Sequence, residues 1–217
     1  MVEVKDRVMN VIERLMLDIP ALQVCREGIE DAFDQLKKCY SNGGKVLICG
    51  NGGSASDSEH IVGELMKGFL LKRKIIEDDV SKIKALFPED CEYLSNHLQG
   101  ALPAISLVSQ SSISSAFIND VAADMVFAQQ VYGYGKQGDV LIGLSTSGNS
   151  KNVVNAIKTA KAFGLATIGM TGEGGGIMKE LCDVLIAVPA METYKIQEYH
   201  LPVYHAICAM IECEFFE

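Results

Sequence analysis

The sequence predicts an α/β fold with a doubly wound, parallel five-stranded sheet, preceded by helices and carrying an inserted helical segment. Five short apolar runs lie along the chain, and each is followed by a loop and a helical stretch. Strands that alternate with helices in this way form a buried parallel sheet with helices on both faces. The chain has 217 residues, which favours one domain over residues 1–217, because two domains of ordinary size need a longer chain.

Composition favours a folded, cytoplasmic protein. Hydrophobic residues make up 48% and charged residues 22% of the chain, which allows a large core and argues against disorder. The net charge of −9 argues against a general positive field, so we expect no nucleic-acid partner. The apolar stretch at residues 184–191 is too short to span a bilayer and the first residues do not resemble a signal peptide, so we expect no membrane partner. The seven cysteines, without a CxxC pair, are expected to be reduced thiols.

Residues 1–42 are predicted to form an N-terminal helical arm. Apolar residues recur there at helical spacing and Pro20 interrupts them, so we expect two helices or one kinked pair. The recurring positions are Val8, Val11, Ile12, Leu15, Leu22, Ile29, Phe33 and Leu36.

The five predicted strands are the apolar runs at residues 45–49, 104–108, 139–144, 166–170 and 183–188. A helical segment follows the first strand and reaches about residue 70. Residues 193–216 are predicted to be helical with a kink at Pro202. Proline removes a backbone donor and crowds the carbonyl of Glu198, at a cost of about 3 kcal/mol.

An irregular segment interrupts this rhythm at about residues 71–100, where no strand signal occurs. Ile76, Val80, Ile83 and Phe87 follow each other at helical spacing with charges between them. This pattern predicts an added amphipathic helix over about residues 74–87.

Two polar loops follow predicted strands, at the edge where open parallel sheets bind ligands. Residues 50–55 read Gly-Asn-Gly-Gly-Ser-Ala, and residues 145–150 read Ser-Thr-Ser-Gly-Asn-Ser. Glycines let a ligand approach the backbone, and helix N-termini and hydroxyls bind anions without cationic side chains. Together the loops favour a cradle for a small sugar phosphate.

Each loop alone is equally well explained as an ordinary cap or turn. Neither is a P-loop, because no Lys follows in the required position. The first loop satisfies G-x-G-x-x-A, so a dinucleotide site is an alternative, with Glu77 or Asp78 as its acidic partner.

A second group of residues suggests metal binding or proton transfer. His60 and Glu64 lie four apart on one helix face, and Gln197, His200 and His205 lie near the other end of the chain. A His/Glu pair at this spacing is usually a surface interaction. Its position just beyond the glycine loop favours a site here.

These motifs, in this order, resemble the phosphoheptose isomerases, which are the sedoheptulose-7-phosphate isomerases of the sugar isomerase (SIS) fold. The resemblance covers nearly the whole chain and rests on residues 50–55, His60, Glu64, Asn119, Asp120, residues 145–150, residues 193–200 and His205. It implies a three-layer SIS-type sandwich and a homotetramer with active sites between subunits. It also implies conversion of sedoheptulose 7-phosphate to D-glycero-D-manno-heptose 7-phosphate, for heptose-containing surface sugars such as those of lipopolysaccharide.

The resemblance also implies roles for individual residues. Zinc is implied as the cofactor, with His60, Glu64, Gln197 and His205 as its ligands. The implied substrate-binding residues are Asn51, Gly52, Gly53, Ser54, Asn119, Asp120, Ser145, Thr146, Ser147, Ser150, Thr193 and Gln197. Ketose–aldose interconversion moves a proton between adjacent carbons through an enediol, and Glu64 and His205 are the natural catalytic proton carriers. We expect metal ligation of these two groups to loosen when substrate arrives.

Some features depart from the family pattern. The segment at about residues 71–100 is longer than in most members, Lys195 stands where Arg is usual, and Tyr194 and Pro202 are unusual. We expect His200 to pack in the helix interface and not to ligate metal. The alternatives are a non-catalytic regulator of the same fold, of the type that associates with replication initiators, and an isomerase or sensor for another sugar phosphate.

Helix geometry constrains the metal site. Gln197 and His205 lie eight residues apart, which is about 12 Å along a helix axis. Either the helix bends at Pro202 or the ligand set draws on more than one chain. We expect a subunit interface at this site, with the N-terminal helices and the last helix as contact surfaces.

Overall fold

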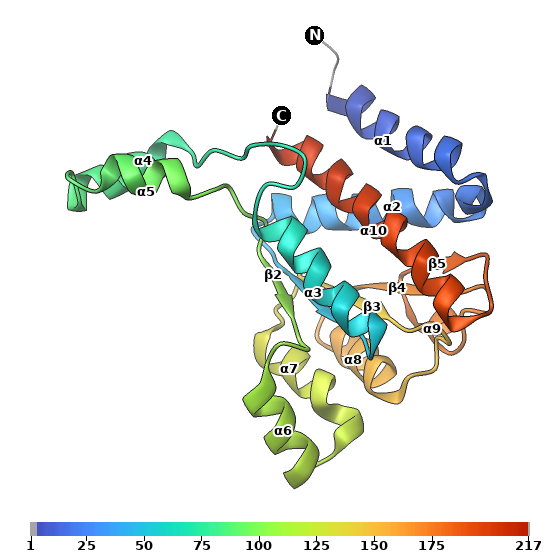
Figure 1. Cartoon of the computed structure of the whole chain (residues 1–217). Coiled ribbons are helices and arrows are strands. Elements are labelled where there is room, and N and C mark those ends of the chain that lie inside the picture. The colour runs from blue at the N-terminus through green and yellow to red at the C-terminus, as the bar shows by residue number, and fades with distance from the viewer. Residues whose placement is uncertain (1–3, 217) are drawn as a thin grey trace.

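The computed structural model describes residues 4–216 and contains a parallel five-stranded sheet in the order β2-β1-β3-β4-β5 (Figure 1). The strands are β1 (Val46–Cys49), β2 (Ala104–Ser106), β3 (Val140–Leu144), β4 (Ala166–Gly172) and β5 (Val184–Val188). All five predicted strands are confirmed, with ends shifted by up to two residues. Because every neighbouring pair is parallel, all strands end at the same edge of the sheet.

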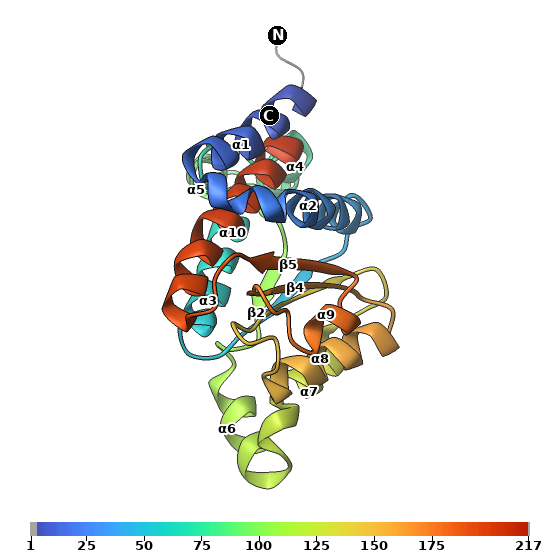
Figure 2. The same ribbon diagram turned by 90° about the vertical axis from the view of Figure 1, so that its right-hand side faces the viewer.

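Helices cover both faces of the sheet (Figure 2). One face packs against α2 (Arg26–Ser41), α3 (Gly53–Met66) and α10 (Thr193–Phe216), with α1 (Val4–Asp18) lying on α10, and the other face packs against α7 (Val126–Tyr134), α8 (Lys151–Ala162) and α9 (Met178–Leu181). Alternation along β1 explains this division, because Ile48 belongs to the first core and Leu47 to the second. The predicted three-layer sandwich is confirmed.

The N-terminal helices belong to the main core. A short 3₁₀ helix, η1 (Pro20–Cys25), separates α1 from α2 at the predicted proline. Ile12, Leu22 and Ile29 are fully buried in the core that includes residues of the sheet and of α10. The residues predicted to form an N-terminal helical arm are helical and pack into the main core.

The last helix, α10, runs unbroken through Pro202 from Thr193 to Phe216. Its residues from Val203 to Ile211 are mostly buried among α1, α2 and α3. This packing holds a single helix together despite the proline.

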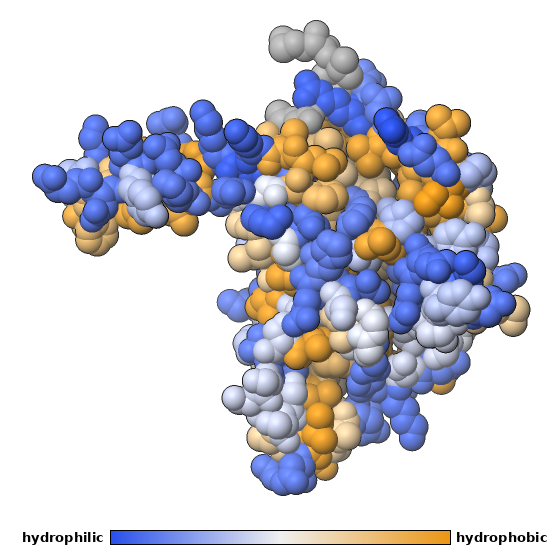
Figure 3. Space-filling view, viewed as in Figure 1, coloured by the Kyte–Doolittle hydropathy of each residue, from blue (hydrophilic) through white to orange (hydrophobic). Residues whose placement is uncertain are grey.

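Two helices project from the body between β1 and β2 (Figure 1). We call residues 74–99 the insertion; it contains α4 (Glu77–Leu86) and α5 (Cys91–His97). The predicted helix over 74–87 is confirmed with a later start, while α5 was not predicted. No residue of α4 is buried, and both hydrophilic and hydrophobic residues show on the insertion's surface (Figure 3). At its base, Gly100 N donates to the Arg73 carbonyl over 2.9 Å.

The remaining elements follow β2. They are α6 (Ser111–Asp120) and a short 3₁₀ helix, η2 (Ala123–Met125), which precede α7. Figure 1 shows α6 extending away from the sheet, and none of its residues is buried. Among residues 4–216, no helix combines the length and apolar character that crossing a bilayer requires.

Candidate functional site

The two polar loops lie at the carboxyl edge of neighbouring strands. Residues 50–52 connect β1 to α3, and residues 145–150 connect β3 to α8. Gly50 is required because a Cβ there would lie 2.6 Å from the Ser54 carbonyl oxygen. Gly52 adopts φ +57°, a conformation that side chains other than glycine rarely tolerate. Both helices therefore begin where the loops present backbone N–H groups, as an anion site requires.

An amide pair connects the two loops. Asn51 Nδ2 donates to Asn152 Oδ1 over 2.9 Å, and Asn152 Nδ2 donates to Asn51 Oδ1 over 2.8 Å. This reciprocal pair fixes the separation of the N-termini of α3 and α8. Asn152 was not predicted; its place in the first turn of α8, just after the serine-rich loop, was the available signal.

Hydroxyl groups line the second loop. Ser145 and Ser150 share a hydrogen bond of 2.9 Å between their Oγ atoms, and Ser147 Oγ accepts from the Asn149 amide over 3.2 Å. Ser54 and Ser145 are buried, Thr146 and Ser150 are half-buried, and Ser147 is exposed. Thr146 also accepts a bond from Gly172 N through its carbonyl. The loop is thus ordered by its own contacts and holds neutral hydroxyls at the strand ends.

The helices α3 and α10 run side by side in the same direction. Gln197, in the first turns of α10, lies against Gly53, where an added Cβ would be 2.5 Å from Gln197 Nε2. Further along both helices, His205 meets His60. Thr193 opens α10 and is exposed. Residues at the start of α3 and residues of α10 therefore lie together within a single chain, with Gly53 beside Gln197 and His60 beside His205.

His60, Glu64 and His205 form one cluster between these helices. His60 Nε2 is 3.1 Å from Glu64 Oε1 and 3.4 Å from His205 Nε2. The Phe69 ring covers His205 at a centroid distance of 5.4 Å. The cluster combines a carboxylate and two imidazoles beside the glycine loop.

The donors of this cluster fit a divalent cation such as zinc. Two ligands that each lie about 2.0–2.1 Å from a tetrahedral zinc ion are about 3.3 Å apart, close to the two distances measured from His60. Glu64 Oε2 is buried without a hydrogen-bond partner, although Lys67 Nζ lies 3.6 Å away. The centre is incomplete, because residues 4–216 contain no group of three or more His, Cys, Asp or Glu side chains ready to hold an ion. Gln197 stays the predicted further ligand.

The cluster's surroundings favour neutral imidazole at His205. Burial lowers the pKa of His205, and the nearby His60 lowers it further, while Glu64 opposes this. A neutral ring can accept a proton or ligate a metal.

Behind His60 lie two residues that were not predicted. The Tyr204 hydroxyl is 3.0 Å from His60 Nδ1 and donates to Asp57 Oδ1 over 3.2 Å. Burial raises the pKa of Asp57, and the bond from Tyr204 opposes that rise. Their signal in the sequence was position alone, since Asp57 lies one helical turn before His60 and Tyr204 adjoins His205.

Three other predicted residues lie outside the cluster. His200 is fully buried with Nε2 3.3 Å from the Thr171 carbonyl oxygen, which agrees with the expected packing role. Asn119 and Asp120 end the projecting helix α6, where both are exposed and Asn119 Nδ2 donates to Asp120 Oδ1 over 2.7 Å. Among residues 4–216 of one chain, the side chains of these two residues form no hydrogen bond to the loops or the cluster, so their place in the site stays a prediction.

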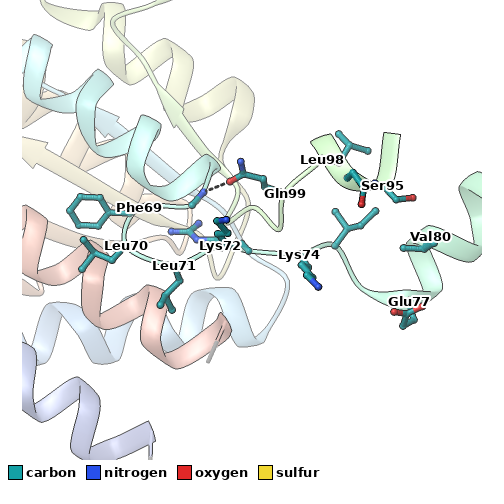
Figure 4. A pocket seen from close by; sticks show the side chains of 14 residues that line it. Phe69, Leu70, Leu71, Lys72, Lys74, Glu77, Val80, Ser95, Leu98 and Gln99 are labelled. Atoms are coloured by element: carbon teal, nitrogen blue, oxygen red, sulfur yellow. Dashed lines mark hydrogen bonds between the residues drawn. The ribbon is translucent and has the colours of Figure 1, made fainter. Parts of the chain in front are cut away.

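A separate hollow of about 750 Å³ lies at the base of the insertion. Figure 4 shows Lys72, Lys74 and Glu77 around it, with Gly68 N donating to Gln99 Oε1 over 2.7 Å. Its lining includes Phe69, which also covers His205. The hollow is thus adjacent to the cluster but distinct from the strand-end loops.

Comparison with known proteins agrees with this arrangement. A family model described as the SIS domain matches residues 10–95 and 96–172. A phosphoheptose isomerase of Clostridium acetobutylicum is 40% identical over 190 residues, covering 88% of this chain and 84% of its own. The chain belongs to the phosphoheptose isomerase family, within the SIS fold. The resemblance noted from the motifs is therefore confirmed.

Other members of the family agree. A phosphoheptose isomerase of Burkholderia pseudomallei is 41% identical over 204 residues, covering 94% of this chain and 90% of its own. The solved structure of a phosphoheptose isomerase from Neisseria gonorrhoeae superposes with a TM-score of 0.70 at 32% identity, covering 96% of this chain and 99% of that one. The similarity to these family members thus covers the sheet, the loops and both helices of the candidate site.

Proposed function

We propose that this chain interconverts sedoheptulose 7-phosphate and D-glycero-D-manno-heptose 7-phosphate. By family it is a sugar-phosphate isomerase, and a small sugar phosphate is its substrate. The observation that carries the proposal is the meeting of His60, Glu64 and His205 beside a glycine loop that opens α3. We propose the cytoplasm as the place of action.

The loops are proposed to hold the phosphate. The N-termini of α3 and α8 supply N–H groups and partial positive charge, and residues 145–150 supply hydroxyls. The Asn51–Asn152 pair keeps the two helix ends at one separation. Neutral donors suit a chain of net charge −9, in which anion binding must be local.

The position of the cluster suits a long substrate. His60 lies seven residues after Gly53, which is about 10 Å along α3 at 1.5 Å per residue. A phosphate at the loop and a carbonyl at the cluster therefore require several carbons between them, as in a seven-carbon sugar phosphate.

Glu64 and His205 are proposed to carry the proton between C1 and C2. They approach His60 from two helices, so one group can stand on each side of a bound enediol. Neutral His205 is suited to accept a proton, and Glu64 keeps Oε2 free of hydrogen bonds. Zinc is the proposed cofactor, held by His60, Glu64, His205 and Gln197; when bound, it would supply a Lewis acid that stabilises negative charge on the reacting oxygens.

The test is turnover of sedoheptulose 7-phosphate by the purified full chain. We expect aldose formation that is lost after dialysis against a chelator and restored by zinc. Aldose formation at full rate in the chelated protein would contradict the metal proposal alone. The absence of aldose under every metal condition, with turnover of another sugar phosphate, would contradict the substrate assignment.

We also propose a homotetramer with active sites between subunits. Support comes from α6, which bears Asn119 and Asp120 yet extends away from its own site and exposes Ile113 and Ile118. A second copy that received α6 could bring these polar residues to a neighbouring cluster. Light scattering should give four times the mass of one chain, and a monomeric, fully active enzyme would contradict the assembly.

A further inference from the structure

His60 is held from behind by a hydrogen-bonded series of three side chains. The Tyr204 hydroxyl lies 3.0 Å from His60 Nδ1 and 3.2 Å from Asp57 Oδ1. Asp57 and His60 come from the same face of α3, while Tyr204 comes from α10 and is 2% exposed. The opposite ring nitrogen, His60 Nε2, faces Glu64 and His205.

The protons of this series can be assigned. A carboxylate only accepts hydrogen bonds, so the single hydroxyl proton of Tyr204 is donated to Asp57 Oδ1. The Tyr204 oxygen then has only acceptor sites left for His60, which favours an imidazole proton on Nδ1. With that proton on Nδ1, the lone pair of Nε2 faces Glu64 Oε1 at 3.1 Å and His205 Nε2 at 3.4 Å, an arrangement that a cation among them stabilises. Without a cation, the Glu64 carboxylate favours a proton on Nε2.

We infer that Tyr204 and Asp57 are positioning residues that fix the tautomer and ring orientation of His60, so that Nε2 is presented to a divalent cation. The inference rests on the metal site of the proposed function. Histidines that ligate metals usually donate their other N–H to such a partner, and loss of that partner typically weakens metal binding about 10–100-fold.

A packing role alone does not explain this arrangement. Phenylalanine would fill the place of the Tyr204 ring and leave no buried hydroxyl. Asp57 Oδ2 is buried without a hydrogen-bond partner. Burying an unpaired carboxylate oxygen is unfavourable, so packing alone does not explain why a carboxylate lies here. A cation held by His60 would be stabilised by the negative charge of Asp57, whose effect reaches the imidazole through the hydrogen bonds of Tyr204.

The test compares Tyr204→Phe with Tyr40→Phe in the full chain. Tyr40 is a matched control, since it is also buried and its hydroxyl donates to the Pro103 carbonyl over 3.4 Å, away from the cluster. Zinc affinity would be measured by competition with a chromophoric chelator. We expect an affinity loss of about 10–100-fold for Tyr204→Phe and none for Tyr40→Phe. Asp57→Asn, which keeps an acceptor for Tyr204, should retain more affinity than Asp57→Ala.

A second readout does not depend on metal. Long-range ¹H–¹⁵N NMR spectra of the metal-free protein distinguish the two histidine tautomers; because Glu64 favours Nε2–H in both proteins, we expect a larger Nδ1–H population for His60 in the wild type than in Tyr204→Phe. Equal zinc affinity, or an equal tautomer population, in wild type and Tyr204→Phe would overturn the inference. A change of the tautomer population in a protein that takes up no zinc would instead overturn the proposed metal site.

Discussion

Arg73 and Glu212 form an ion pair that is sealed inside the protein, with Arg73 Nε 2.7 Å from Glu212 Oε1 and side-chain exposures of 0% and 1%. Glu212 also accepts the backbone N–H groups of Phe69, Leu70 and Leu71. Arg73 donates to the carbonyls of Glu64 and Leu65 at the end of α3. The pair thus joins α3, α10 and the base of the insertion.

Removing one partner of this pair should strongly destabilise the protein. Arg73→Met leaves the Glu212 charge buried without its cation, and such changes cost about 3–5 kcal/mol. Urea unfolding would measure this loss. Arg14→Met is the matched control, because the Arg14–Asp18 pair is 80% and 58% exposed and such pairs contribute at most about 1 kcal/mol. Equal losses in the two variants would show that burial does not set the strength of these pairs.

Stability should fall in acid because of His200. Burial lowers the pKa of His200 to about 4, below the ordinary value of 6.5. The folded state therefore favours the neutral ring, so the stabilisation is present above pH 6.5 and declines as pH falls toward 4. At about 1.4 kcal/mol per pKa unit, the decline approaches about 3 kcal/mol. Unfolding measured from pH 7 to 4 should show a shallower decline for His200→Gln, and the wild-type decline for the exposed His97→Gln. An unchanged decline in His200→Gln would exclude His200 as its source.

Gly53→Ala should impair activity with little effect on stability. The added Cβ would lie 2.5 Å from Gln197 Nε2, and the flexible end of Gln197 can move away. Because misplacement by about 1 Å can cost about 100-fold in rate, we expect kcat/KM to fall by about 10–100-fold. Gly63→Ala is the control on the same helix; its Cβ meets nothing within 4 Å, so it should add about 0.5–1 kcal/mol of stability. Full activity in Gly53→Ala would show that the position of Gln197 is unimportant.

Glu64→Gln and His205→Asn should each lower kcat by about 100–10,000-fold, the usual contribution of a general acid or base. KM should change less, because the loops proposed to hold the phosphate are untouched. Steady-state kinetics would separate the two effects, with Glu92→Gln and His97→Asn on α5 as controls of matched chemistry. A rise in KM at constant kcat would assign both residues to binding and not to proton transfer.

Replacing residues 76–97 with a short Gly-Ser linker should leave the core folded. No residue of α4 is buried, and the two ends of the insertion are already joined between Gly100 N and the Arg73 carbonyl. Loop length changes the closure free energy by only about 0.6 kcal/mol per doubling. Thermal unfolding should therefore be nearly unchanged. A large loss of stability would show that α4 and α5 support the core.

Sequence patterns predicted the sheet well, because β-strands such as Val140–Leu144 are uninterrupted apolar runs that only a buried parallel sheet accommodates. They located η1 through Pro20. The last helix was predicted to be helical with a kink at Pro202, and α10 does continue through that proline. There, contacts of Val203 and Ile207 with the core compensate for one missing backbone bond.

The structure brings together His60, Glu64 and His205, three of the residues that the motifs singled out as a candidate site. Asp57, Asn152 and Tyr204 were missed because their roles depend on partners more than 100 residues away in the sequence. Arg73 and Glu212 were missed for the same reason, since a buried ion pair leaves no local pattern. Helix α5 was missed because it is short and exposed and lacks apolar periodicity.

Helix α3 carries both the glycine loop at its start and His60 further along. The proposed phosphate loop and the imidazole of His60 are fixed to one helix, so their spacing is set by the seven-residue separation of Gly53 and His60. Adding or deleting a helical turn there would change the span by about 5.4 Å. Under the proposed function, this stretch of backbone sets the length of sugar chain that spans from the phosphate loop to the cluster, largely independent of which side chains surround the sugar's hydroxyls.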